Sequence, residues 1–131
     1  MFVRRSINIV GFSHGKQPIP AASRVGPLVV TGGVYGLNRE TGALPNDASE
    51  QAKLMFENLR SILDAAGVTC ESVVRMTIFV RTPAIRDVVN AEWVKMFPDA
   101  SSRPARHTIQ NDNLPENMLV QCDAIAFASG T

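Results

Sequence analysis

The strongest constraint on the fold is a helix, a strand and a second helix that follow one another between residues 47 and 98. Apolar side chains recur every three or four positions from 48 to 66, as they do on the buried face of an amphipathic helix. Asp47 and Glu50 have the spacing of a capping box at its start, and Gly67 is a residue type that ends helices. We therefore predict a long helix with one face packed against a sheet.

The next segment, 73–80, is short, apolar and rich in β-branched residues, which predicts a central strand. Strict alternation gives it two apolar faces, one with Val74, Met76, Ile78 and Val80 and the other with Val73, Thr77 and Phe79. Thr82 and Pro83 have the residue types of an N-cap and a first helical position. The second helix then runs over apolar positions from 85 to 97 and ends at Pro98.

Strands are expected on both sides of this unit, at 2–10, 28–31, 105–110 and 118–127, with 34–35 continuing the second strand across a bulge. Loops are expected at 11–20, 38–46, 99–103 and 111–117. The order β-β-α-β-α-β-β indicates an α+β domain with both helices on one face of a mixed sheet. Because the other face is also fairly apolar, we expect copies of the chain to associate.

The 131 residues, 45% of them hydrophobic, are enough for a single domain spanning 1–131. A formal net charge of +1 makes nucleic acid a weak class of partner. The N-terminus has no apolar signal segment and no stretch is long enough for a membrane span, which predicts a soluble cytoplasmic protein. Cys70 and Cys122 do not form a disulfide framework, and Cys122 is expected to be a small buried residue.

Motifs for phosphate loops, dinucleotides, zinc proteases and hydrolase elbows are absent from the sequence. The two histidines, His14 and His107, lie far apart in sequence, so no metal site is predicted. His14 lies in a glycine-containing loop and is expected to be solvated.

Arg106 is the first candidate for chemistry. Alternation in the 105–110 strand places Arg106, Thr108 and Gln110 on one face, and a guanidinium beside a hydroxyl can bind a carboxylate through two parallel hydrogen bonds. An ordinary surface ion pair is the alternative. In the last strand Gln121 and Asp123 share a face; the amide can bind a ligand but cannot accept a proton, and Asp123 is the nearest acid.

Several short segments, in order, resemble the Rid family, the YjgF-like reactive-intermediate deaminases also called L-PSP endoribonucleases, over about residues 18 to 127. They are Glu40-Thr41-Gly42-Ala43-Leu44, Glu57-Asn58-Leu59, Leu63-Asp64-Ala65-Ala66-Gly67, Thr77-Ile78-Phe79-Val80, Val89-Asn90, Phe97-Pro98, Pro104-Ala105-Arg106 and Leu114-Pro115. The resemblance implies a chorismate-mutase-like fold and a homotrimer with three ligand clefts at subunit interfaces. It also implies that Arg106 holds the carboxylate of a 2-imino acid, which water hydrolyses to a 2-oxo acid and ammonia without cofactor or metal. Asn90 matches a position near this cleft.

The sequence departs from the family pattern at four cleft positions. Gln121 stands where the deaminases have a glutamate that positions or activates water, Ile19 where a tyrosine is usual, Gly32 where a serine is usual, and Thr108 where a cysteine is frequent. Loss of the carboxylate removes a proton acceptor, and acid–base catalysis commonly contributes about 10²–10⁴ in rate.

Three functions therefore stay open. The first is an imine or enamine hydrolase in which Arg106 holds the carboxylate, Thr108 and Gln121 orient water, and Asp123 stands in as a base; orientation alone accelerates such a reaction. The second is a non-catalytic trimer that binds a small carboxylate-bearing metabolite. The third is the endoribonuclease of the family's older name, which the balanced charge and few aromatic residues disfavour.

Overall fold

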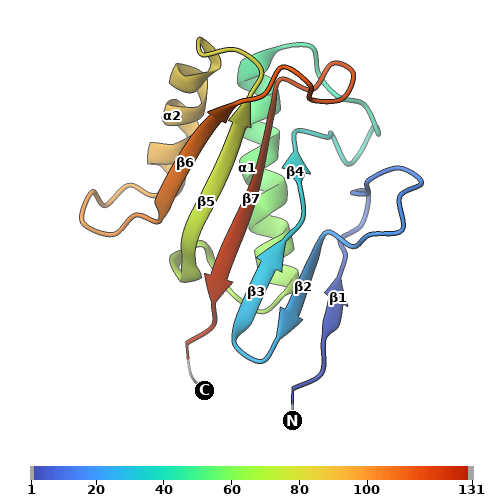
Figure 1. The fold of residues 1–131 in the computed structure, drawn as a ribbon, viewed down its shortest axis with the longest axis vertical. Coiled ribbons are helices and arrows are strands. Elements are labelled where there is room, and N and C mark those ends of the chain that lie inside the picture. Colours follow the sequence, from blue (N-terminus) through green and yellow to red (C-terminus); the bar gives the residue numbers. More distant parts are fainter. Residues whose placement is uncertain (1, 130–131) are drawn as a thin grey trace.

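A computed structural model describes residues 2–129 of the chain as one mixed sheet with two α-helices against one of its faces (Figure 1). The elements of the described part, in chain order, are β1 (Arg5–Ile7), β2 (Ala22–Val25), β3 (Leu28–Thr31), β4 (Val34–Tyr35), α1 (Ala48–Ala65), the 3₁₀ turn η1 (Cys70–Ser72), β5 (Val73–Val80), α2 (Ile85–Met96), β6 (Ala105–Gln110) and β7 (Val120–Phe127). The predicted α+β class and the placement of both helices on one face are confirmed. Within these residues, no helix is long and apolar enough to cross a membrane.

The sheet has seven strands in the order β1-β2-β3-β7-β5-β6, and the short β4 also pairs with β7. The last strand of the chain thus lies in the middle of the sheet, between β3 and β5 (Figure 1). β5 and β6 are parallel and are joined through α2, whereas the other pairs are antiparallel. A parallel pair needs such a crossover, which explains why α2 packs behind the edge of the sheet that carries β6.

The first helix forms as its sequence predicts. The side chain of Asp47 accepts a hydrogen bond from the backbone N–H of Glu50 at 3.0 Å, which caps the helix N-terminus. At the other end Gly67 adopts φ +82°, a left-handed conformation that glycine reaches without strain and that stops the helix.

The start of the second helix differs from the prediction. Thr82 and Pro83 form a turn, in which the Thr82 carbonyl accepts from the N–H of Ile85 at 3.2 Å, and the helix begins only at Ile85. Its N-cap residue is Ala84, which has no side chain able to cap, so the assignment of Thr82 as the N-cap is wrong. The end at Met96, before Pro98, is as predicted.

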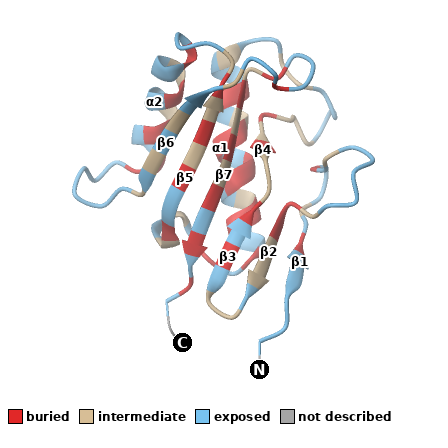
Figure 2. Ribbon diagram, viewed as in Figure 1, coloured by how far each residue is buried: buried red, intermediate tan, exposed pale blue. Residues whose placement is uncertain are grey.

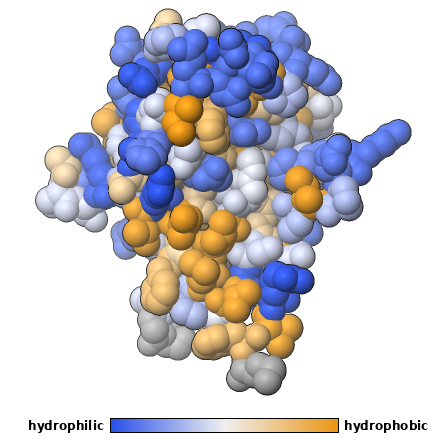
Figure 3. Space-filling view, viewed as in Figure 1, coloured by the Kyte–Doolittle hydropathy of each residue, from blue (hydrophilic) through white to orange (hydrophobic). Residues whose placement is uncertain are grey.

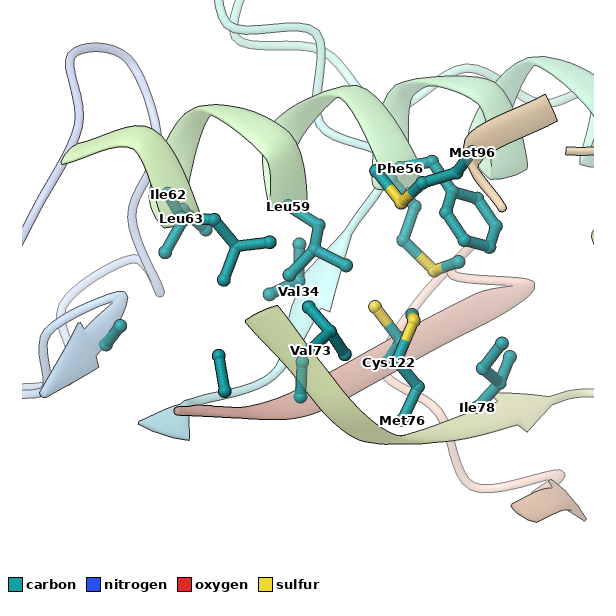
Figure 4. Packing of buried hydrophobic residues seen from close by; sticks show 14 of the residues in the cluster. Val34, Phe56, Leu59, Ile62, Leu63, Val73, Met76, Ile78, Met96 and Cys122 are labelled. Atoms are coloured by element: carbon teal, nitrogen blue, oxygen red, sulfur yellow. The ribbon is translucent and has the colours of Figure 1, made fainter. Parts of the chain in front are cut away.

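The core lies between the sheet and α1 (Figures 2 and 4). Met55 and Leu59 of α1 and Met76 and Ile78 of β5 have no exposed surface, and Figure 4 shows Leu59, Met76 and Ile78 directed into the same layer. Cys122 of β7 is also fully buried there, as predicted; burial raises the pKa of its thiol, and the charge of Asp123 raises it further.

One strand face was predicted incorrectly. A β-bulge interrupts the pairing of β5 with β7 between Val73 and Arg75, so Val73 faces the core and Val74, 56% exposed, faces outward. Beyond the bulge the predicted alternation holds, with Met76, Ile78 and Val80 buried. Strand β2 was not predicted, because its sequence Ala22–Val25 contains two polar residues and only a short apolar signal.

The sheet face opposite the helices has no cover within residues 2–129, and it carries a group of exposed apolar side chains near one end (Figure 3). We call this group the open-face patch: Leu28, Val30, Val74, Ile125 and Phe127, each between 38% and 56% exposed. The register places Leu28 opposite Phe127 and Val30 opposite Ile125, so the patch is continuous across β3 and β7. Exposed apolar surface of this kind is typical of an interface.

Candidate functional site

Arg106 is held against α2 on the helix-covered face of the sheet. Its Nη2 donates to Oδ1 of Asn90 at 2.7 Å, and its Nε donates to Oγ1 of Thr108 at 2.7 Å. The guanidinium also lies 4.9 Å from the centre of the Trp93 ring, within the range of a cation–π interaction. We call these four residues, Arg106, Asn90, Thr108 and Trp93, the arginine clamp.

The local sequence explains this grouping. Arg106 and Thr108 alternate onto one face of β6, as predicted. Asn90 and Trp93 are three residues apart on α2 and therefore share one face of the helix. The crossover from β5 through α2 to β6 brings that helix face over the edge strand. The clamp is thus built from two neighbouring elements of one β-α-β unit.

The charge of Arg106 has no carboxylate partner within residues 2–129, where the single ion pair joins Lys95 to Glu92. The surface ion pair weighed for Arg106 is therefore wrong for this part of the chain. Partial burial lowers the pKa of the guanidinium, and the nearby charge of Arg86 lowers it further. Of the five N–H groups of an arginine, two are used by the clamp. The remaining donors and two uncompensated cations suit an anionic ligand.

Ile19 and Gln121 line a different site, a pocket of about 660 Å³ that we call the loop pocket. It lies between the loop that precedes β2, the β4 region and the loop that precedes β7. Its wall is mixed, with apolar side chains and a few polar groups: His14, Gly15, Gln17, Ile19, Tyr35, Leu37, Gly42, Leu44, Pro115, Glu116, Met118 and Gln121. Pockets with this combination of apolar lining and few polar groups commonly bind small molecules.

Gln121 is half-buried in this pocket and packs closely against the backbone of Gly33. A Cβ atom on Gly33 would lie 3.0 Å from Cδ and Nε2 of Gln121, so a larger residue at this position would require the Gln121 amide to shift slightly. The Gln121 amide also contacts the sulfur of Met118, with Nε2 3.5 Å from Sδ. Gly32 does not line the pocket but lies beside it, with space for a Cβ 3.7 Å from Cε1 of His14.

His14 is not solvated, which corrects the prediction. Its Nε2 lies 2.6 Å from the carbonyl oxygen of Gly33, and its ring packs edge-on against Phe12 with a centroid distance of 5.5 Å. Tyr35 packs beside both rings and donates its hydroxyl to the Ser13 carbonyl at 2.6 Å. Burial raises the pKa of the Tyr35 hydroxyl, which keeps it protonated.

The arginine clamp and Gln121 lie on opposite faces of the same sheet. Arg106 contacts α2 and is therefore on the helix side. Gln121 precedes Cys122, whose side chain is in the core beneath the helices, so alternation directs Gln121 to the open face. Residues predicted to act together are thus divided into two groups within one chain, and β5 lies between the strands that carry them.

Asp123, considered as a base, is separate from both groups. It lies on the open face opposite Thr77, outside the residues that line the loop pocket. Burial raises the pKa of its carboxyl, while the charge of Arg75 and a hydrogen bond with Thr77 act in the opposite direction. His107 is nearby on the open face, where its Nδ1 is 2.7 Å from Nη2 of Arg75.

Sequence reasoning missed the roles of Trp93, Arg86, His14 and Tyr35. The spacing of Asn90 and Trp93 was a usable signal, because residues three apart share a helix face. Nothing local indicated the role of His14, because its hydrogen-bond partner Gly33 and the neighbouring Tyr35 ring are about 20 positions away in sequence. A further pocket of about 510 Å³, between η1 and the end of α2, contains none of the predicted site residues. Residues 2–129 contain no cluster of three or more His, Cys, Asp or Glu that could hold a metal.

The sequence model of the family described as "Endoribonuclease L-PSP" matches residues 16–128, which is nearly the whole chain. The chain belongs to this family, which includes the Rid and YjgF proteins. Among curated members, the 2-iminobutanoate/2-iminopropanoate deaminase of Salmonella typhimurium is 32% identical over 103 residues, covering 78% of this chain and 80% of that protein. A RutC family protein of Haemophilus influenzae is 33% identical over 111 residues, covering 83% and 85%.

Solved structures of L-PSP family members share the fold. Escherichia coli TdcF, crystallised with bound serine, superposes with a TM-score of 0.87 at 26% identity, covering 95% of this chain and 99% of that one. The E. coli YjgF gene product gives a TM-score of 0.86 at 26% identity with the same coverage. The predicted YjgF-type architecture is therefore confirmed.

Proposed function

We propose that this L-PSP family member hydrolyses a small imine or enamine that bears a carboxylate, converting a 2-imino acid to a 2-oxo acid and ammonia. The observation that carries the proposal is Arg106, a half-buried guanidinium held by two neutral acceptors, with no carboxylate partner in residues 2–129 and with donors to spare. Relatives with 30–32% identity are named 2-iminobutanoate/2-iminopropanoate deaminases. The serine bound to TdcF is itself a small carboxylate-bearing molecule.

The residues of the arginine clamp and of the loop pocket have different roles in the proposed reaction. Arg106 binds the substrate carboxylate through two parallel hydrogen bonds, while Asn90 and Trp93 fix the plane of the guanidinium. The Thr108 hydroxyl accepts from Arg106 and keeps its own proton to donate toward a bound water. Gln121 orients that water from the loop pocket, beside Ile19 and next to Gly32. The oxygen of water bonds to the imine carbon, and the carbon–nitrogen bond then breaks to release ammonia.

The division of these residues between the two sheet faces leads us to place the reaction between two copies of the chain. One copy supplies the arginine clamp and its neighbour supplies the loop pocket. A closed ring of three copies, a homotrimer, gives three equivalent clefts of this kind. The exposed open-face patch supports such an assembly, because association removes its apolar side chains from water.

The assembly is tested by light scattering after size-exclusion chromatography. We expect the mass of a trimer for the wild type and a smaller mass for Phe127→Asp, which puts a charge into the patch. Val94→Asp is the matched control, since Val94 is an exposed apolar residue on α2, on the helix layer and away from the patch. A wild-type monomer contradicts the shared cleft.

The reaction is tested with 2-iminopropanoate generated in place by an amino-acid oxidase or dehydratase, with 2-oxo acid formation as the readout. Loss of two charge-assisted hydrogen bonds in Arg106→Ala is expected to lower kcat/KM by about 10²–10³-fold. Arg60→Ala, which removes an exposed arginine of α1, is expected to retain wild-type activity. Equal rates with wild type and Arg106→Ala contradict the proposed function.

A non-catalytic carboxylate-binding protein is the second candidate, and Gln121 favours it because an amide cannot take a proton from water. Calorimetry with pyruvate separates the two functions. Arg106-dependent binding of pyruvate without any turnover of the imine supports the binding protein, whereas Arg106-dependent turnover supports the hydrolase.

A further inference from the structure

One ring nitrogen of His14, in the loop pocket, is bonded to the backbone, whereas the other has no partner among the described residues. Its Nε2 lies 2.6 Å from the carbonyl oxygen of Gly33. A carbonyl oxygen can only accept, so Nε2 carries a proton in both the neutral and the charged form of the ring. In the neutral form Nδ1 is therefore the atom with the free lone pair. The backbone bond fixes the tautomer, as in many histidines that transfer protons.

The Nδ1 atom is buried and has no hydrogen-bond partner among the described residues. A buried acceptor without a donor is unfavourable, because it has given up its bond to water and gained no other. The rings of Phe12 and Tyr35, which pack around His14, offer it no donor, because the Tyr35 hydroxyl is bonded to the Ser13 carbonyl. The chain thus holds a basic nitrogen that has no donor among the described residues, and water reaches this nitrogen only when the ring or the groups that cover it shift.

The position of His14 connects this nitrogen with the proposed chemistry. His14 and Gln121 both line the loop pocket, and both contact Gly33: His14 at the carbonyl oxygen and Gln121 beside the α-carbon. The imidazole edge at Cε1 is also the nearest side chain to Gly32. A basic group therefore lies beside the amide that occupies the water-orienting position.

Few other groups in the pocket can accept a proton. The titratable residues that line it are His14, Tyr35 and Glu116. The raised pKa of Tyr35 keeps its hydroxyl protonated. Glu116 is an exposed residue of the loop before β7, whereas His14 is fixed by a short hydrogen bond and by two aromatic contacts. The free lone pair of a neutral imidazole can take a proton from water, as a general base does.

We propose that His14 is the proton acceptor for the hydrolysis, and this inference rests on the proposed function. The water oxygen bonds to the iminium carbon, the carbon–nitrogen π electrons move to nitrogen, and one water proton passes to Nδ1 of His14. The charged His14 then protonates the amine nitrogen of the carbinolamine. The carbon–nitrogen bond breaks with its electrons leaving on ammonia, and the hydroxyl proton is released to solvent as the 2-oxo acid forms.

The test is the pH dependence of kcat/KM for 2-iminopropanoate in wild type, His14→Gln and Glu116→Gln. The amide of a glutamine can still donate to the Gly33 carbonyl but has no basic nitrogen, so His14→Gln keeps the structural bond and removes the base. For the wild type we expect a rate that rises with pH as the base loses its proton. His14→Gln is expected to lose this rise and about 10²–10⁴-fold in rate at pH 8. Glu116→Gln, which removes the carboxylate of the pocket wall, is expected to keep the rise with pH whatever its effect on the size of the rate.

A double variant distinguishes loss of the base from damage to the fold. His14→Gln combined with Gln121→Glu returns a carboxylate to the pocket, so its activity is expected to recover with the rise moved to a lower pH. If His14→Gln keeps the rate and the profile of the wild type while Arg106→Ala is inactive, the assignment of His14 is wrong and the proposed function stands. If the wild type shows no Arg106-dependent hydrolysis, the proposed function is wrong, and the role of His14 is rejected with it.

Discussion

Replacing Gln51 by leucine tests how the loop pocket is held in shape. Gln51 lies on α1 and has no exposed surface. Its Nε2 donates to the carbonyl oxygens of Pro45 at 2.6 Å and Asn117 at 2.9 Å, and its Oε1 accepts from the N–H of Leu119 at 2.8 Å. These bonds fix both sides of Met118, a residue of the pocket wall.

The magnitude follows from these three bonds. Leucine has a similar volume but leaves two carbonyls and one N–H unpaired, at about 1–3 kcal/mol each. The additional apolar surface of leucine offsets roughly 1 kcal/mol. Because Asn117 is an exposed loop residue whose freed carbonyl can be hydrated, two groups stay unpaired, and we expect Gln51→Leu to lower the free energy of unfolding by about 3 kcal/mol.

Urea unfolding at one fixed protein concentration measures this loss, since the proposed association of copies would make the stability depend on concentration. Gln110→Leu, the same change at an exposed position of β6, is the matched control and is expected to stay within about 0.5 kcal/mol of the wild type. A loss below about 1 kcal/mol for Gln51→Leu would mean that the three backbone groups find other partners easily, and that Gln51 is not needed to hold the loop pocket.

Three further predictions concern single side chains. Arg81→Ala removes the donors to four backbone carbonyls of the loop before β7. We therefore expect a lower urea midpoint and weaker pyruvate binding, with intermediate values for Arg81→Lys. An unchanged midpoint would contradict a role of Arg81 in holding this loop. Iodoacetamide is expected to modify the half-buried Cys70 in the folded protein well before the fully buried Cys122, as mass spectrometry of the digested protein would show. The raised pKa of Asp123 means that the folded state keeps its proton to higher pH than the unfolded state. The protonated carboxyl therefore stabilises the folded state below about pH 3.9, and this contribution is lost as the pH rises through the pKa of Asp123 in the folded protein. Over that range the free energy of unfolding of the wild type should fall relative to that of Asp123→Asn. A rise instead would contradict a raised pKa at Asp123.

The order of elements and the buried faces were largely predictable, because local periodicity determines them. The capped start of α1 at Asp47 and the burial of Cys122 in β7 follow from patterns that span only a few residues. Local reasoning failed where tertiary contacts decide the outcome. The β-bulge in β5 exchanges the faces expected for Val73 and Val74, because the register with β7 shifts between Val73 and Arg75. No feature of the β5 sequence alone indicates that shift.

The candidate site was predictable in part for a related reason. Alternation along β6 correctly placed Arg106 beside Thr108, and both lie on one strand. The position of His14 depends on a hydrogen bond to Gly33, 19 residues away, and on the Tyr35 ring of another strand. The separation of Arg106 from Gln121 depends on the register with β5, which pairs Arg106 with Met76 and Gln121 with Phe79, two residues on opposite faces of that strand.

A cleft that two copies of the chain share can be tested with mixed assemblies of two defective variants. Arg106→Ala lacks the clamp and Gln121→Ala lacks the water-orienting amide, so each is expected to be nearly inactive alone. When equal amounts are unfolded together and reassembled at random, about one cleft in four receives a wild-type clamp from one copy and a wild-type loop pocket from its neighbour. A cleft built from two copies therefore predicts recovery of about a quarter of the wild-type rate. Because every chain in the mixture carries one defect, no recovery would contradict a cleft shared between copies.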